Sequence, residues 1–219
     1  MKILVTRPLP GGETSAARLR ALGCAVVTMP LLAVEAIDWD MPAAPPDAIM
    51  LTSAAAARMA GAPAAALHGC TAWAVGDATA AAARAAGFTD VRDGGGSVQA
   101  LVDRAAAAGI GEILHLAGAD RTTFTVPTGL TIIIRTVYRA RLLPLAGAVD
   151  ADWVLLYSSR TAAHFAAECD RLGHDRAGIA IAAISPAVLA AAGPGWAWTT
   201  VAATPDEDAL LAAIGLLCQ

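Results

Sequence analysis

The stretch TAWAVGDATAAAARAAG, which begins at Thr71, contains groups that could bind an anion. Ala72–Val75 is a short apolar run typical of a buried strand, and Gly76 and Asp77 interrupt it before an alanine-rich segment that favours a helix. The first N–H groups of a helix have no internal partner, so this turn is suited to a carboxylate or phosphate. Gly76 would allow close approach to the backbone, and Thr79 would offer a hydroxyl. An ordinary strand-to-helix turn with Asp77 as N-cap fits the same residues.

Composition limits the classes of protein to which this chain can belong. The chain has 219 residues, of which 57% are hydrophobic and 16% charged, so one large or two small domains with a sizeable core are expected. A net charge of −4 argues against a general nucleic-acid binder, which needs a basic face.

The start MKILVTRP is too short for a signal peptide, and the longest uncharged stretch, Ala177–Pro205, is broken by proline and glycine rather than continuous like a membrane span. Cys24, Cys70, Cys169 and Cys218 form no CxxC pair, which indicates free thiols in a cytoplasmic protein.

Several motifs for cofactor or nucleophile chemistry are missing. There is no GxGxxG after a strand, no Walker lysine and no GxSxG turn. His68, His115, His164 and His174 lack metal-ligand spacing, and each is expected to be a surface or strand histidine without a functional role. Any chemistry must therefore depend on positioning, backbone donors, hydroxyls and arginines, with no metal or cofactor.

Strand and helix patterns alternate along the chain, which predicts parallel α/β sheets with right-handed crossovers. Ser53, Ser97 and either Ser158 or Ser159 are expected to cap helices, and residues 117–121 to form a loop or a helix start. The expected strands are Lys2–Thr6, Cys24–Met29, Asp47–Thr52, Ala72–Val75, Phe88–Val91, Glu112–Leu116, Thr131–Leu143, Asp152–Tyr157, Ile179–Ile184 and Thr199–Val201. The expected helices are Glu13–Leu22, Ala54–Ala60, Thr79–Ala86, Val98–Ala108, Arg160–Leu172, Ala187–Ala192 and Asp206–Leu217.

The chain contains an internal repeat. DAIMLTSA from Asp47 is echoed by DWVLLYSS from Asp152, KILVTRP from Lys2 by EILHLAG from Glu112, and AVGDATAAAARAAG from Ala74, less closely, by AAISPAVLAAAG. A repeat near half the chain length implies two similar α/β domains. Ligand turns would then face a cleft between them.

Together these motifs resemble the uroporphyrinogen-III synthase family. The resemblance rests on ILVTRP, DAIMLTSAAAA, AVGDATAAAARAAGF, VYRA, the second aspartate–strand–Ser-Ser element and TPDEDALLAAI, and it covers nearly the whole chain. It implies two flavodoxin-like or Rossmann-like parallel-sheet domains joined by a two-stranded connector. Residues 1–34 with 142–219 would form one domain, residues 36–138 the other, and Leu31–Ile37 and Val137–Leu143 the connectors.

The resemblance also implies a function. The family converts hydroxymethylbilane, a linear tetrapyrrole polycarboxylate, into uroporphyrinogen III with loss of water and inversion of ring D, without metal or cofactor. Tyr138 matches the family's connector tyrosine and would protonate the leaving hydroxyl, although a half-buried strand tyrosine fits equally. The substrate-binding candidates are Arg7, Thr52, Ser53, Ala54, Gly76, Asp77, Ala78, Thr79, Gly118, Ser158, Ser159 and Ser185. Because an acidic chain repels a polyanion, Arg7, Arg121, Arg139 and Arg160 are expected to supply local positive potential, although Arg7 could instead be a packing or surface arginine.

Two binding turns depart from the family. Ser185-Pro186-Ala187 replaces a turn that often carries threonines, and Leu116-Ala117-Gly118 lacks the family's arginine. A non-catalytic, two-lobed small-molecule binding or sensor module is therefore the alternative. In either case the chain is expected to be a monomer that binds a small molecule and neither nucleic acid nor membrane.

Overall fold

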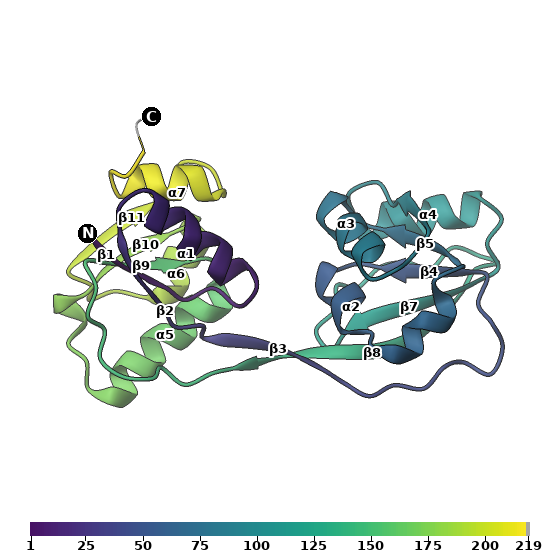
Figure 1. Ribbon diagram of the computed structural model, residues 1–219, viewed down its shortest axis with the longest axis horizontal. Coiled ribbons are helices and arrows are strands. Elements are labelled where there is room, and N and C mark those ends of the chain that lie inside the picture. The colour runs from purple at the N-terminus through teal and green to yellow at the C-terminus, as the bar shows by residue number, and fades with distance from the viewer. Residues whose placement is uncertain (218–219) are drawn as a thin grey trace. The chain divides into compact units, whose positions relative to one another are not determined.

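The computed structural model describes residues 1–217, and the chain divides into two compact units. The first unit comprises Met1–Ala33 and Arg141–Gln219, and the second comprises Val34–Ala140. Each unit contains a sheet dominated by parallel strands, with helices on both faces (Figure 1). The prediction of two parallel-sheet α/β units is therefore confirmed.

The sheet of the first unit has the strand order β2-β1-β9-β10-β11, and all neighbouring strands are parallel. Numbered by their order within this unit, the strands follow the flavodoxin-like order 2-1-3-4-5. The elements are β1 (Lys2–Val5), α1 (Gly11–Ala21), β2 (Ala25–Thr28), β9 (Trp153–Leu156), α5 (Ser159–Leu172), η2 (Arg176–Gly178), β10 (Ala180–Ala183), α6 (Pro186–Ala192), β11 (Trp198–Val201) and α7 (Glu207–Ala213).

The sheet of the second unit has the order β3-β8-β7-β4-β5-β6, and its pairs from β8 to β6 are parallel. Without the edge strand β3, this is the Rossmann-like order 3-2-1-4-5. The elements are β3 (Leu32–Ala36), β4 (Ala48–Leu51), α2 (Ala54–Met59), the 3-10 helix η1 (Ala62–Leu67), β5 (Thr71–Ala74), α3 (Asp77–Ala85), β6 (Asp90–Asp93), α4 (Val98–Ala107), β7 (Glu112–Gly118) and β8 (Thr131–Leu142).

Each sheet is covered on both faces because its strands are apolar on both faces. In the first unit, Leu4 packs in the layer with α5 and α6, while Ile3 and Val5 pack in the layer with α1 and α7. In the second unit, Ile49 lies in the layer with α2 and α3, and Met50 lies in the layer with α4. Successive strand residues point to opposite faces, so continuous apolar runs specify central strands.

Serine caps hold the starts of four helices. Ser53 accepts from the N–H of Ala55, and Ser97 from that of Ala100, as predicted. Ser158 rather than Ser159 caps α5. Ser185 likewise caps α6 and accepts from the N–H of Val188 at 3.4 Å. Each cap satisfies a donor that the helix itself leaves unpaired.

Three predicted boundaries are wrong for identifiable reasons. Helix α3 begins at Asp77 rather than at the predicted Thr79, and its N-cap is Gly76, so the alternative with Asp77 as the cap is also wrong. The sixth strand begins at Asp90 rather than Phe88, because the Phe88 N–H donates to the Ala83 carbonyl of α3 instead of pairing with a strand. The last helix ends at Ala213, just before Gly215, whose φ of +76° lies in the left-handed region that stops a helix.

Other predicted features concern the thiols and the membrane. Cys24, Cys70 and Cys169 are free, and Cys218 lies outside the described residues. Of the helices found in residues 1–217, none combines the length and apolar character needed to cross a membrane.

Glu168 anchors the segment between β8 and β9 to helix α5. Its carboxylate accepts from the N–H of Leu145 at 2.8 Å and receives a bidentate pair from Arg171 at 2.7 and 2.8 Å. The Arg171 guanidinium, followed by the Leu145 N–H, lowers the pKa of Glu168 from 4.5 to about 2. A carboxyl whose pKa is lower in the folded protein stabilises the fold above its unfolded pKa.

We expect Glu168→Gln to lower the free energy of unfolding at neutral pH. The difference from wild type should shrink as the pH falls from 4.5 toward 2, because wild-type Glu168 then loses its charge. Urea unfolding across this pH range measures it. Glu13→Gln is the control, because Glu13 lies 3.9 Å from Arg20 in an exposed pair that contributes little. A wild-type–Glu168→Gln difference independent of pH would contradict the assignment.

Candidate functional site

Each sheet contains one pair of neighbouring strands from whose carboxyl ends the chain continues in opposite directions. In the first unit, β1 leads to β2 on one side and β9 leads to β10 on the other. In the second unit, β4 leads to β5 on one side and β7 leads to β8 on the other. Such a topological switch point leaves a crevice outside the carboxyl ends of the two strands, where open α/β sheets bind ligands.

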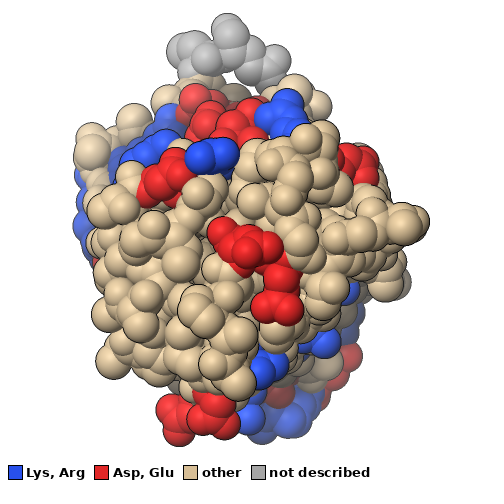
Figure 2. Space-filling view, turned by 90° about the vertical axis from the view of Figure 1, so that its right-hand side faces the viewer, with Lys and Arg blue, Asp and Glu red and all other residues tan. Residues whose placement is uncertain are grey.

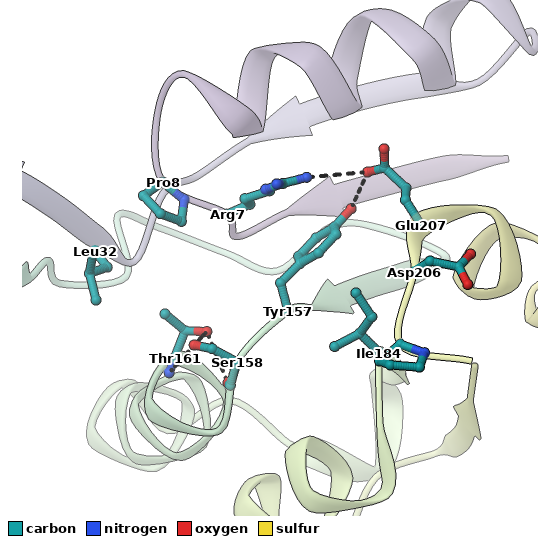
Figure 3. A pocket seen from close by; sticks show the side chains of 10 residues that line it. Arg7, Pro8, Leu32, Tyr157, Ser158, Thr161, Ile184, Asp206 and Glu207 are labelled. Carbon is teal, nitrogen blue, oxygen red and sulfur yellow. Dashed lines mark hydrogen bonds and ion pairs between the residues drawn. The ribbon is translucent and has the colours of Figure 1, made fainter. Parts of the chain in front are cut away.

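A cavity of about 510 Å³, here called the first cavity, lies at the switch point of the first unit (Figure 3). Its walls come from the ends of β1 and β9, the start of α5 and the start of α7. The lining residues are Arg7, Pro8, Leu32, Tyr157, Ser158, Thr161, Ile184, Pro205, Asp206 and Glu207.

Charges of both signs meet in the first cavity. Arg7 Nη1 lies 3.8 Å from the Glu207 carboxylate and donates to Ser15 at 3.2 Å. Its guanidinium also lies over the Tyr157 ring, 5.2 Å from the centroid. The Tyr157 hydroxyl donates to Glu207 at 3.0 Å (Figure 3). A ligand carboxylate would therefore compete with Glu207 for Arg7.

Tyr157 is unsuited to transferring its proton to a ligand. Burial, opposed by a hydrogen bond from Ser15 and reinforced by the Glu207 charge, raises the pKa of Tyr157 above its ordinary value. The phenol remains neutral and acts as a hydrogen-bond donor to Glu207.

A cavity of about 130 Å³, here called the second cavity, lies at the switch point of the second unit. Its walls come from the ends of β4 and β7, the start of α4, the segment after β7 and one residue of β8. The lining residues are Thr52, Ser53, Val98, His115, Gly118, Asp120, Arg121, Thr122 and Tyr138. Four of the predicted site residues meet here, namely Thr52, Ser53, Gly118 and Tyr138.

A glycine makes room for the Tyr138 ring. Gly118 is paired with Tyr138 across a register shift between β7 and β8. A Cβ on Gly118 would lie 2.5 Å from Cζ and 2.7 Å from the hydroxyl oxygen of Tyr138. Gly118 is therefore the residue that allows the phenol to lie against the end of β7.

Polar contacts link three elements around the second cavity. The Thr52 hydroxyl lies 3.2 Å from His115 Nε2. Arg121 Nη1 donates to the Thr136 hydroxyl on β8 at 3.0 Å. The Asp120 carboxylate also lines this cavity. Because a guanidinium carries five N–H donors, Arg121 can bind an anion in addition to the Thr136 hydroxyl.

Two further predicted site residues, Arg7 and Ser158, line the first cavity, and the remaining ones lie outside both sets of lining residues. Gly76, Asp77 and Ala78 form the start of α3, and Thr79 is buried with 8% exposure, so its hydroxyl offers little surface to a ligand. Ser159 donates to the carbonyl of Ala187. The remaining two are Ala54 and Ser185. Of the four predicted arginines, Arg139 pairs with Glu35 at 3.3 Å.

Sequence reasoning missed His115, Tyr157 and Glu207. His115 interrupts the buried apolar run of β7, and that interruption was the signal. Tyr157 stands before Ser158 as Thr52 stands before Ser53, a correspondence visible in the repeat. Within residues 1–217, no group of three His, Cys, Asp or Glu side chains is placed to hold a metal ion.

Comparisons with known proteins point to one family. A sequence model described as "Uroporphyrinogen-III synthase HemD" matches residues 13–212. The structure of uroporphyrinogen-III synthetase from Helicobacter pylori superposes with a TM-score of 0.65 at 16% identity, covering 99% of each chain. A mutant uroporphyrinogen III synthase from Thermus thermophilus gives a TM-score of 0.49 at 13% identity, covering 98% of this chain and 96% of that one. Curated protein sequences contain no match to this chain.

We expect Gly118→Ala to displace the Tyr138 ring and to lower the free energy of unfolding by about 1–3 kcal/mol, the usual cost of overpacking. Chemical denaturation measures the cost, and ring NMR signals report the displacement, because the chain has only two tyrosines. Gly76→Ala is the matched control, since no described atom lies within 4 Å of its added Cβ and its φ of −163° suits alanine. Unshifted Tyr138 signals in Gly118→Ala would refute the packing argument.

Proposed function

Because the chain belongs to the uroporphyrinogen-III synthase family, we propose that it cyclises hydroxymethylbilane to uroporphyrinogen III in tetrapyrrole biosynthesis, with loss of water and inversion of ring D. The observation that carries this proposal is the family match over residues 13–212. The enzyme is then a cyclising hydro-lyase.

The reaction needs positioning more than reactive side chains. Loss of the hydroxyl gives an electrophilic azafulvene, and ring D must attack through its substituted carbon to form a spiro intermediate, whereas free solution favours direct closure. Holding the substrate so that the substituted carbon is closest is an orientation effect. Protonation of the leaving hydroxyl is general acid catalysis.

The second cavity supports the binding part of the proposal. Its volume of about 130 Å³ suits one carboxylate arm rather than a whole tetrapyrrole, since sites for drug-sized ligands occupy about 300–1,000 Å³. Thr52 and Ser53 supply hydroxyls, and Arg121 supplies positive charge. We assign an acetate or propionate of the substrate to this cavity.

Tyr138 is the proposed proton donor. Its ring lies against Gly118, and it lines the second cavity beside the proposed carboxylate site. A phenol has the acidity of a weak general acid and needs no metal to assist it.

The first cavity supports a second group of contacts. Arg7 and Ser158 line it, and they are proposed to bind another substituent of the substrate. Gly118 remains a proposed contact in the second cavity. The backbone at the starts of the neighbouring helices remains a further proposed contact, at Ala54, Gly76, Asp77, Ala78, Thr79, Ser159 and Ser185.

Charge has to be supplied locally for a polyanion. The face shown in Figure 2 is largely uncharged, with acidic side chains near its centre and basic side chains in small groups. In a chain of net charge −4, binding then depends on a few directed donors. We further propose that the protein acts in the cytoplasm as a monomer without cofactor.

We expect the purified protein to convert hydroxymethylbilane into the type III isomer, whereas the uncatalysed reaction gives type I. Chromatographic separation of the oxidised products measures the isomer ratio. Heat-denatured protein is the control. A type I product at every protein concentration would reject catalysis and leave a binding module as the remaining function.

Tyr138→Phe should lower kcat by at least about tenfold, because general acid catalysis usually contributes more than that. The free energy of unfolding should change little, since the ring and its packing against Gly118 are kept. Initial rates and urea unfolding of the same preparation separate the two effects. Wild-type rates in the variant would exclude Tyr138 as the proton donor.

A further inference from the structure

His115 is a buried polar residue that the proposed reaction does not yet use. It lies in β7, is 1% exposed, and lines the second cavity. Its ring lies 6.1 Å from that of Phe124 in the segment after β7. Only one ring nitrogen is paired within the described residues, because Nε2 lies 3.2 Å from the Thr52 hydroxyl and Nδ1 has no hydrogen-bond partner there.

Packing alone does not require a histidine at this place. Strands β1 and β7 occupy the same place in the two sheets, each beside the central strand that follows the repeated aspartate motif. The strand registers make Val5 the counterpart of His115, since Val5 pairs with Leu155 and His115 with Met50. Val5 is fully buried and apolar. A polar ring with one orphaned atom is costly where valine suffices.

The imidazole of His115 is neutral in the folded protein. Burial, followed by the nearby Arg121 guanidinium, lowers the pKa of His115 from 6.5 to about 4. A neutral imidazole carries one N–H, and its other nitrogen is an acceptor. The identity of the protonated nitrogen decides which way the Thr52 hydroxyl points its own proton.

We propose that His115 is a positioning residue: its Nε2–H donates to Thr52 Oγ1, so that the Thr52 O–H is free to donate to a substrate carboxylate in the second cavity. This inference rests on the proposed function, since it assigns the anion that the cavity receives. The alternative tautomer would bury an unpaired Nδ1–H and would consume the Thr52 proton. Buried N–H groups without a partner are rarer than underused acceptors, and a carboxylate needs a donor from Thr52 rather than a lone pair.

The tautomer is measurable in the free protein. Long-range ¹H–¹⁵N correlation spectra at neutral pH distinguish protonated from unprotonated ring nitrogens, and the chain has only four histidines to assign. We expect His115 to carry its proton on Nε2. A proton on Nδ1, or a doubly protonated ring, would overturn the proposal. This readout needs no enzymatic activity.

A pair of amide variants tests the same contact by kinetics. The Gln amide nitrogen can reach the place of Nε2, while the shorter Asn amide corresponds to Nδ1. We therefore expect His115→Asn to raise KM for hydroxymethylbilane about tenfold, the loss of one hydrogen bond to a charged group, with kcat within about twofold. His115→Gln should restore KM to near the wild-type value. Equal KM values in wild type and a folded His115→Asn would overturn the proposal.

A double variant tests whether His115 acts through Thr52. Thr52→Val should raise KM about as much as His115→Asn, and the two changes combined should raise it no further. Additive effects would overturn the proposed route. His174→Gln is the control histidine, because His174 contacts the Gly147 carbonyl in the first unit. If wild type yields no type III isomer, the proposed function fails, whereas the tautomer still decides the orientation of Thr52.

Discussion

The divergence of chain connections beside the central strand of each sheet is the constraint on which the rest of the structure depends. A crossover covers the carboxyl end of the strand that it leaves, but two crossovers that depart in opposite directions leave the space between them open. Both cavities lie at such a gap, one beside β1 and β9 and the other beside β4 and β7. The polar residues that line them come from strand ends, from the helix starts that follow and, in the second unit, from the segment after β7.

The two sheets have the same spatial arrangement of parallel strands, but the chain forms these strands in a different order in each unit. Reading β2-β1-β9-β10-β11 against β8-β7-β4-β5-β6 aligns every parallel strand. The sequence echoes follow this alignment, because β9 corresponds to β4, β1 to β7, and β10 to β5. Repeated positions therefore share burial and capping, with Ser53 and Ser158 both starting a helix. His115 against Val5 is a position at which the two units differ within this frame.

Charge is distributed differently in the two cavities. In the first, Arg7 is already shared with Glu207, and Tyr157 holds that carboxylate in place. In the second, Arg121 donates to a neutral hydroxyl on β8, the neighbouring histidine is neutral, and the Asp120 carboxylate also lines the cavity.

The sequence by itself determined the α/β class, the repeat, most strand and helix positions and the serine caps, because these depend on local apolar periodicity and on side chains that bond their own backbone. It also singled out Thr52, Ser53, Gly118 and Tyr138, through turn chemistry and family resemblance. Only the tertiary structure decided that these four line one cavity, that Thr79 is buried, and that His115 lies against Thr52. Those facts depend on strand order and register, which bring together residues far apart in the chain and which no local pattern encodes.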